Sequence, residues 1–236
     1  MSTVRTPEPA RARFTPPRET AFDFRLKDQN NHPTSLKDAR GDVVVMTFIY
    51  SSCRDLCPAE GNVVSDAVEQ VGSGVQAYVI SVDPIGDTSK RVKEWLTRRD
   101  LPDATSHYLI GSRKQLRPVW QAYGIVPLVA SPQEAKAAMD GSSTFWKQNP
   151  YNPGNPKRPY ETPPPRDAPS QAAQDYPYTG DLEYRGHVRH VAGWNFEHSA
   201  YVLLIDKHGE QRVGIPFEEL DATSLVNDIR VLRSET

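Results

Sequence analysis

One stretch constrains the fold more than any other part of the chain: Val43–Tyr50, with the sequence VVVMTFIY. It is apolar at nearly every position and rich in β-branched residues. A strand with one solvated face alternates between apolar and polar residues, whereas a strand buried on both faces reads as a continuous apolar run. Two further runs, Gln76–Val82 and Ala200–Asp206, have the same character. The pattern predicts an α/β domain built around a central sheet.

Helical patterns alternate with these strands. From Cys53 to Val71, apolar residues recur near i, i+4 and i+7 spacing, and glycines end the pattern. The other expected elements are an N-terminal β-hairpin (22–36), helices at 88–99 and 112–124, a strand at 106–110, a hairpin at 200–214 and a last helix from about 221. Strand–helix alternation indicates parallel strands with right-handed crossovers, and the closing hairpin makes the sheet mixed.

The chain has 236 residues, which suits a single domain with additional segments. Its 21 prolines cluster before residue 20 and between Pro127 and Pro177. We therefore expect a disordered arm at 1–20 and one domain at 21–236, interrupted by a long proline-rich insertion at 126–195. Helical structure is plausible within the insertion at 132–139, and we interpret His187 and His190 as exposed side chains.

The charge and hydropathy of the chain argue against two classes of protein. The formal net charge is −2 at pH 7, so the basic footprint of a nucleic-acid-binding protein is missing. No window approaches the ~20 apolar residues of a membrane-spanning helix. The first twenty residues combine arginines with prolines and lack an apolar core, so they do not resemble a signal peptide or an anchor.

The only two cysteines, Cys53 and Cys57, occupy a position that indicates chemistry. A disulfide across so short a loop removes little entropy from the unfolded chain. The pair follows the central strand and opens a helix, where ligands of α/β sheets gather and where the helix N-terminus favours a thiolate. On one helix the two α-carbons would lie roughly 6 Å apart, which a disulfide tolerates. We expect the pair to bridge reversibly or to bind a metal ion.

A third candidate ligand, His198, lies just before the strand at 200–206. This strand opens a tight hairpin after a long excursion, so we expect it to run antiparallel to the central strand. Its first residues then lie at the sheet edge where the cysteines are, and His198 faces them. Asp83 ends a strand at the same edge, although Asp-Pro is also ordinary turn chemistry. Two thiolates and one imidazole suit copper, whereas a closed zinc site needs a fourth ligand.

These residues resemble the SCO/SenC family of copper-binding, thioredoxin-like assembly proteins. The resemblance runs from about Phe22 to Ile125 and resumes from Glu197 to the C-terminus. The matching pieces are Cys53-x-x-x-Cys57-Pro58, Val82-Asp83-Pro84 followed by Asp87-Thr88, Ala122-Tyr123-Gly124, and His198-Ser199 before an apolar strand. The cysteine spacing alone is weak, but the combination is specific.

The resemblance implies that Cys53, Cys57 and His198 bind one copper ion, as Cu⁺ or Cu²⁺. It implies delivery of copper to the copper A centre of cytochrome c oxidase, or reduction of that centre's cysteines, and so a copper-accepting oxidase subunit as partner. It also implies the cell envelope, on the periplasmic side, with the cytoplasm as the alternative for a chain without an anchor. The chain departs from the family at Arg54, where proline is frequent, and in its long insertion.

Three other interpretations stay open, and with them the question of whether the chain is an enzyme. A thiol–disulfide oxidoreductase would use Cys53 as the attacking and Cys57 as the resolving thiol, without a copper role. A peroxidase of related fold would place Thr or Ser three residues before the attacking cysteine, where this chain has Tyr50. A docking or sensor protein would act through the insertion at 126–195.

Overall fold

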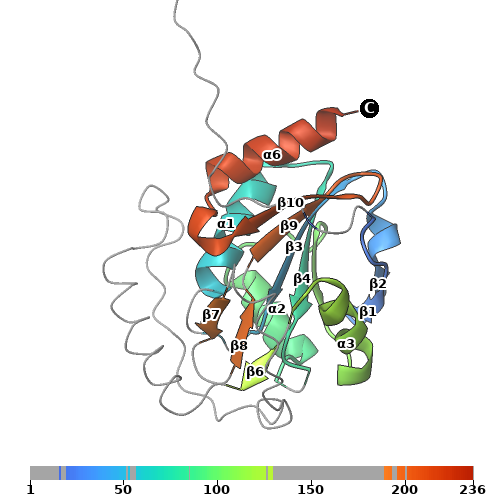
Figure 1. Cartoon of the computed structure of the whole chain (residues 1–236), viewed down its shortest axis with the longest axis vertical. Coiled ribbons are helices and arrows are strands. Elements are labelled where there is room, and N and C mark those ends of the chain that lie inside the picture. Colours follow the sequence, from blue (N-terminus) through green and yellow to red (C-terminus); the bar gives the residue numbers. More distant parts are fainter. Residues whose placement is uncertain are drawn as a thin grey trace, which may run out of the picture.

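The computed structural model describes residues 16, 20–51, 53, 57–84, 86–125, 127–129, 189–192, 196–199 and 201–235 (Figure 1). Of the arm predicted at 1–20, only residues 16 and 20 are therefore described. Thr20 forms an isolated bridge with Glu210, and its hydroxyl donates to the Glu210 carboxylate. The predictions for the rest of the arm lie outside the described residues.

A five-stranded mixed sheet forms the centre of the molecule, in the order β10-β9-β3-β4-β5 (Figure 1). Its strands are β3 (Val43–Ile49), β4 (Val75–Ser81), β5 (Ser106–Leu109), β9 (Tyr201–Ile205) and β10 (Gln211–Pro216). β3 is buried along its whole length, as its apolar run predicts. β3 pairs in parallel with β4 on one side and antiparallel with β9 on the other. β4 in turn pairs in parallel with β5. The predicted α/β class and mixed central sheet are confirmed.

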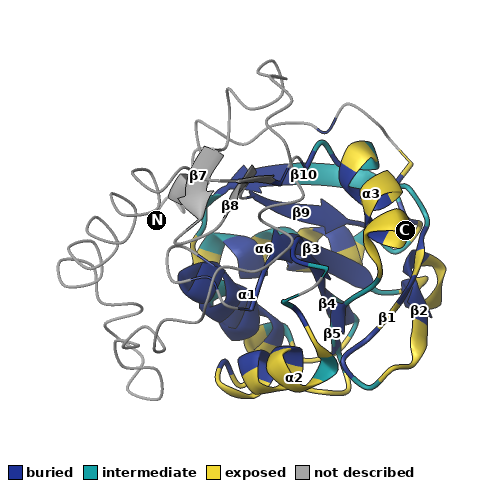
Figure 2. Cartoon of the chain, turned by 90° about the horizontal axis from the view of Figure 1, so that it is seen from below, coloured by how far each residue is buried: buried dark blue, intermediate teal, exposed yellow. Residues whose placement is uncertain are grey.

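Helices cover both faces of this sheet (Figure 2). They are α1 (Cys57–Val71), α2 (Ser89–Thr97), α3 (Arg113–Ala122) and α6 (Ala222–Ser234). α1 packs beside α6, and Gly61 of α1 lies directly against Trp95 of α2, so these three helices share one face. α3 lies on the opposite face with the N-terminal hairpin. Side-chain caps fix two of the helix starts, because Thr88 accepts from the Arg91 amide and Asp221 from the Ser224 amide.

The N-terminal hairpin predicted at 22–36 is confirmed with shorter strands, β1 (Arg25–Lys27) and β2 (Pro33–Ser35), and leads into the short helix η1 (Leu36–Ala39). The hairpin of β9 and β10 is followed by the short helix η3 (Phe217–Glu219).

A second, three-stranded sheet adjoins the predicted insertion. It consists of β6 (Leu128–Val129), β7 (Arg189–Ala192) and β8 (Phe196–Ser199), in the order β6-β8-β7. The two ends of the insertion therefore form strands that pair with β8. Between β6 and β7 the chain, including the helix predicted at 132–139, lies outside the described residues.

Candidate functional site

The segment that carries Cys53 is a turn at the end of β3. The Cys53 amide donates to the Tyr50 carbonyl at 3.1 Å, which closes this turn. Helix α1 begins at Cys57. Cys53 itself is not helical, so our expectation that one helix carries both cysteines is wrong; residues 54–56 lie outside the described part of the structure. The expectation that the pair directly follows the central strand is confirmed.

The two thiols are buried and interact with each other. Cys53 is 2% exposed and Cys57 is 3% exposed. The pKa of the Cys57 thiol is raised, first by burial, then by its hydrogen bond with the Cys53 side chain and by the charges of Cys53 and Glu60. A backbone hydrogen bond from Tyr50 acts in the opposite direction. The two buried thiols thus interact, and a soft cation would offset the cost of burying thiolates there.

A buried carboxyl lies one helical turn beyond Cys57. Glu60 is fully buried, and the Thr47 hydroxyl of β3 donates to its Oε1. Its Oε2 has no hydrogen-bond partner among the described residues. Burial raises the pKa of Glu60 to about 7, and the hydrogen bond from Thr47 partly counteracts this. The sequence analysis missed this residue, although a glutamate on an apolar helical stripe was a visible signal.

A second buried carboxyl, Asp87, contacts the segment that carries Cys53. Its Oδ1 accepts from the Ser51 amide at 2.8 Å and from the Ser51 hydroxyl at 2.6 Å. Its Oδ2 accepts from the Ser81 hydroxyl at 2.6 Å and the Tyr108 hydroxyl at 3.1 Å. Burial and then the charge of Asp83 raise the pKa of Asp87 to about 7. The sequence analysis cited Asp87 only as part of a motif.

Asp83 closes the turn that presents Asp87. Its Oδ1 accepts from the Gly86 amide at 2.8 Å, and its carbonyl accepts from the Asp87 amide at 3.0 Å. The side chain is fully buried. Asp83 thus has a defined role in the turn at the end of β4, which was the simpler of the two interpretations, and a supporting role at the cysteines remains a proposal.

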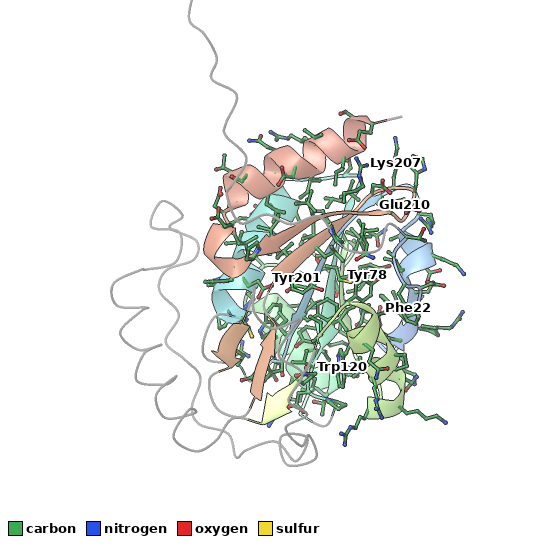
Figure 3. The ribbon with its side chains drawn as sticks, in the orientation of Figure 1. Phe22, Tyr78, Trp120, Tyr201, Lys207 and Glu210 are labelled. Carbon is green, nitrogen blue, oxygen red and sulfur yellow. The ribbon has the colours of Figure 1, made fainter. Side chains whose placement is uncertain are left out.

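Aromatic side chains of the opposite face hold the same sheet edge (Figure 3). The Trp120 indole of α3 donates to the Ser81 carbonyl at 2.9 Å, and the Tyr201 hydroxyl donates to the Tyr123 carbonyl. The rings of Tyr201 and Phe48 lie 6.1 Å apart, centroid to centroid. The two hydrogen bonds join α3 to the end of β4 and to the start of β9, and the ring pair joins the end of β3 to the start of β9.

The topology around His198 follows the expectation in part. β9 runs antiparallel to β3, so its first residues lie at the edge where β3 ends and the cysteine turn begins. His198 belongs to β8, which ends two residues before β9 starts, and its register partner in β7 is His190. We expected it to precede a strand directly, but it is itself part of one. The side chain of His198 lies outside the described part of the structure, so its distance from the cysteines is not tested.

Within the described ranges, no group of three or more His, Cys, Asp or Glu side chains is arranged to hold a metal ion. Likewise, no helix among the described residues has the length and apolar character to cross a membrane.

Comparison with known proteins supports the expected relationship. The family model described as SCO1/SenC matches residues 13–152, more than half of the chain. A Stutzerimonas stutzeri protein named for copper binding is 27% identical over 144 residues, which are 55% of this chain and 64% of the relative. The mitochondrial protein SCO2 of Saccharomyces cerevisiae is 27% identical over 121 residues, which are 50% of this chain and 38% of the relative. The chain thus spans less than two thirds of the length of either relative.

The solved structures agree at the level of the fold. The structure of Bradyrhizobium japonicum ScoI with copper bound superposes with a TM-score of 0.57 at 19% identity, covering 90% of this chain and 99% of that chain. The thioredoxin-like fold that the sequence predicted is therefore confirmed. The matched family model and the shared fold together lead to one conclusion: the chain belongs to the SCO1/SenC family.

Proposed function

We propose that this protein is a copper carrier that holds one copper ion between Cys53, Cys57 and His198. The observation that carries the proposal is the buried pair of interacting thiols at the end of the central strand. Each thiol would lose its proton as a sulfur–copper bond forms, and Cu⁺ would keep its oxidation state. A cation that binds both sulfurs neutralises the charge that makes buried thiolates costly.

Two kinds of finding support copper over other metals. Thiolate and imidazole ligands are soft, and a site with few ligands of this kind favours copper over calcium or magnesium. The chain also belongs to the SCO1/SenC family, one of its relatives is named for copper binding, and ScoI was solved with copper bound. The proposal for His198 is supported by the antiparallel pairing of β9 with β3, which brings the chain after β8 to the edge of the cysteine turn.

The proposed recipient is a copper-accepting protein, the copper A subunit of cytochrome c oxidase. Membership of the family supports this step, since the family resemblance implies delivery of copper to that centre or reduction of its cysteines. The proposed location is the cell envelope, on the periplasmic side. A test is transfer of one copper ion from the loaded protein to a purified copper A domain, followed by the absorption of that centre. An absence of transfer would contradict the proposed recipient.

One specific observation favours a second candidate, a thiol–disulfide oxidoreductase. The Cys53 and Cys57 thiols interact directly, so the pair could reduce a disulfide in another protein without copper. The raised pKa of Cys57 suits the resolving rather than the attacking thiol, because a thiol that holds its proton is a poor nucleophile.

The experiment that separates the two is a Cu⁺ titration of the reduced protein against a competing chelator, without oxygen. Wild type should bind one ion tightly, and Cys57→Ser and His198→Ala should each weaken binding by about tenfold or more. His190→Ala is the matched control, because His190 is the register partner of His198 in the same small sheet. Equal binding by wild type and His198→Ala would refute the three-ligand site, and weak binding by wild type would leave the dithiol reductant as the function.

A further inference from the structure

We propose that Asp87 is a positioning residue for the cysteine pair, holding the turn that carries Cys53 through its contacts with Ser51. The proposal rests on the proposed function, since it concerns the same thiols. The carboxylate is 5% exposed and lies between the cysteine turn on one side and two strands of the sheet on the other.

The contacts of Asp87 divide evenly between these two sides. One oxygen accepts two hydrogen bonds from Ser51, from its amide at 2.8 Å and its hydroxyl at 2.6 Å. The other accepts from Ser81 at the end of β4 and from Tyr108 of β5. Ser51 lies inside the turn that the Cys53 amide closes on the Tyr50 carbonyl. The carboxylate thus fastens that turn to the rigid sheet.

The position of Asp87 is itself fixed by its own turn. The Asp87 amide donates to the Asp83 carbonyl at 3.0 Å, and the Gly86 amide donates to Asp83 Oδ1 at 2.8 Å. A Cβ at Gly86 would lie 2.0 Å from Asp83 Oδ2, so any larger residue there would displace the Asp83 carboxylate that holds this turn. Thr88, the next residue, caps α2. Because Asp87 is held by its own turn, its hydrogen bonds can fix the position of Ser51 and, through the backbone, of Cys53 two residues later.

Holding Cys53 matters because both expected reactions need two sulfurs at a fixed separation. A disulfide forms only over a narrow range of separations, and a two-sulfur metal site loses affinity when one ligand is free to move. Buried carboxyl groups are costly, so a carboxyl placed at this turn and given four donors is better explained by a positioning role than by packing.

The test uses two pairs of variants, each measured for Cu⁺ affinity and for the reduction potential of the Cys53–Cys57 disulfide. Asp87→Ala removes every acceptor and should weaken Cu⁺ binding by about tenfold or more. Asp87→Asn keeps an oxygen for both Ser51 donors and should restore binding to within about threefold of wild type. The Asp87→Ala disulfide should be easier to reduce, by about tenfold in its equilibrium constant, which corresponds to about 30 mV.

The second pair is Ser51→Ala and Ser81→Ala, which remove two hydroxyls at the same 2.6 Å distance from Asp87. Only Ser51 lies on the cysteine turn, so only Ser51→Ala should weaken Cu⁺ binding and shift the potential. Equal effects of the two serine variants, or an Asp87→Ala protein with wild-type affinity and potential, would overturn the proposal. Should Asp87→Ala fail to fold, the serine pair still decides. A wild-type protein that binds no copper would instead refute the proposed function, and the reduction potentials would still test the positioning role.

Discussion

Replacing Glu60 with glutamine should change how the stability of the protein depends on pH. Glu60 is fully buried, and its pKa is raised from 4.5 to about 7, mainly by burial. The folded state therefore holds this proton more tightly than the unfolded state does. Below pH 4.5 the carboxyl adds no pH-dependent cost, and stability is lost as the pH rises from 4.5 through 7. A shift of this size corresponds to roughly 3 kcal/mol.

Glutamine carries no titrating group, so the Glu60→Gln variant should escape this loss. Its carbonyl oxygen can still accept from the Thr47 hydroxyl, which keeps the one hydrogen bond that Glu60 makes in the described structure. The unfolding free energy of the variant, relative to wild type, should rise by roughly 2–3 kcal/mol between about pH 5 and about pH 8. This rise with pH is expected even if the buried amide lowers the stability of the variant by the same amount at every pH.

The measurement is urea denaturation of the reduced protein across this pH range. Two other groups titrate in this range. Asp87, also with a pKa of about 7, lowers the stability of the protein as the pH rises, and His107, with a lowered pKa, raises it. Both are present in wild type and variant, so they cancel in the difference. Glu69→Gln, an exposed position on the same helix, is the matched control and should follow wild type. Parallel pH curves for wild type and Glu60→Gln would refute the assignment of a buried, proton-binding carboxyl.

Three further outcomes are expected. Gly61→Ala should lower the unfolding free energy by about 1–2 kcal/mol in urea denaturation, because the new Cβ would lie 2.3 Å from the Trp95 ring and this clash outweighs the better helix propensity; an unchanged midpoint would show that the two helices separate freely. Trp120→Phe should cost about 1–3 kcal/mol by the same assay, because the buried Ser81 carbonyl loses its indole donor, and a neutral result would contradict that contact. Cu⁺ affinity should increase from about pH 6 to about pH 8, because the raised pKa of Cys57 makes protons compete with the metal; competition titrations at both values check this, and a flat profile would exclude Cys57 as a ligand.

The parts of the fold that follow from local pattern could be predicted from the sequence. The continuous apolar run at β3 indicated a strand buried on both faces. The hydroxyls of Thr88 and Ser89, either of which can cap a helix, marked where α2 starts, and Thr88 is the cap. The antiparallel direction of β9 followed from the short hairpin after it. These features depend on a few adjacent residues, which is why sequence alone is sufficient for them.

The start of α1 could not be predicted in this way. Helical periodicity extends back to Cys53, but the chain closes a turn on the Tyr50 carbonyl first, and Ser51 in that turn is held by a carboxylate 36 residues away. A contact of that length leaves no mark in local periodicity. The same holds for the pairing of β7 with β8, because β7 lies in the segment predicted as a long polar insertion and β8 lies just beyond it.

The buried polar residues around the cysteines show what the sequence did contain but could not explain. Thr47 is the polar exception in the apolar run of β3, and Glu60 is the charged exception on the apolar stripe of α1; in the structure they bond to each other. In the sequence, Thr47 and Glu60 are each a single polar residue in an otherwise apolar pattern. Only the parallel β3–α1–β4 arrangement brings the two side chains together. Well-packed apolar side chains would serve stability at least as well there. Polar groups buried beside two thiols are instead suited to a site whose charge changes as protons leave and a cation or a disulfide takes their place.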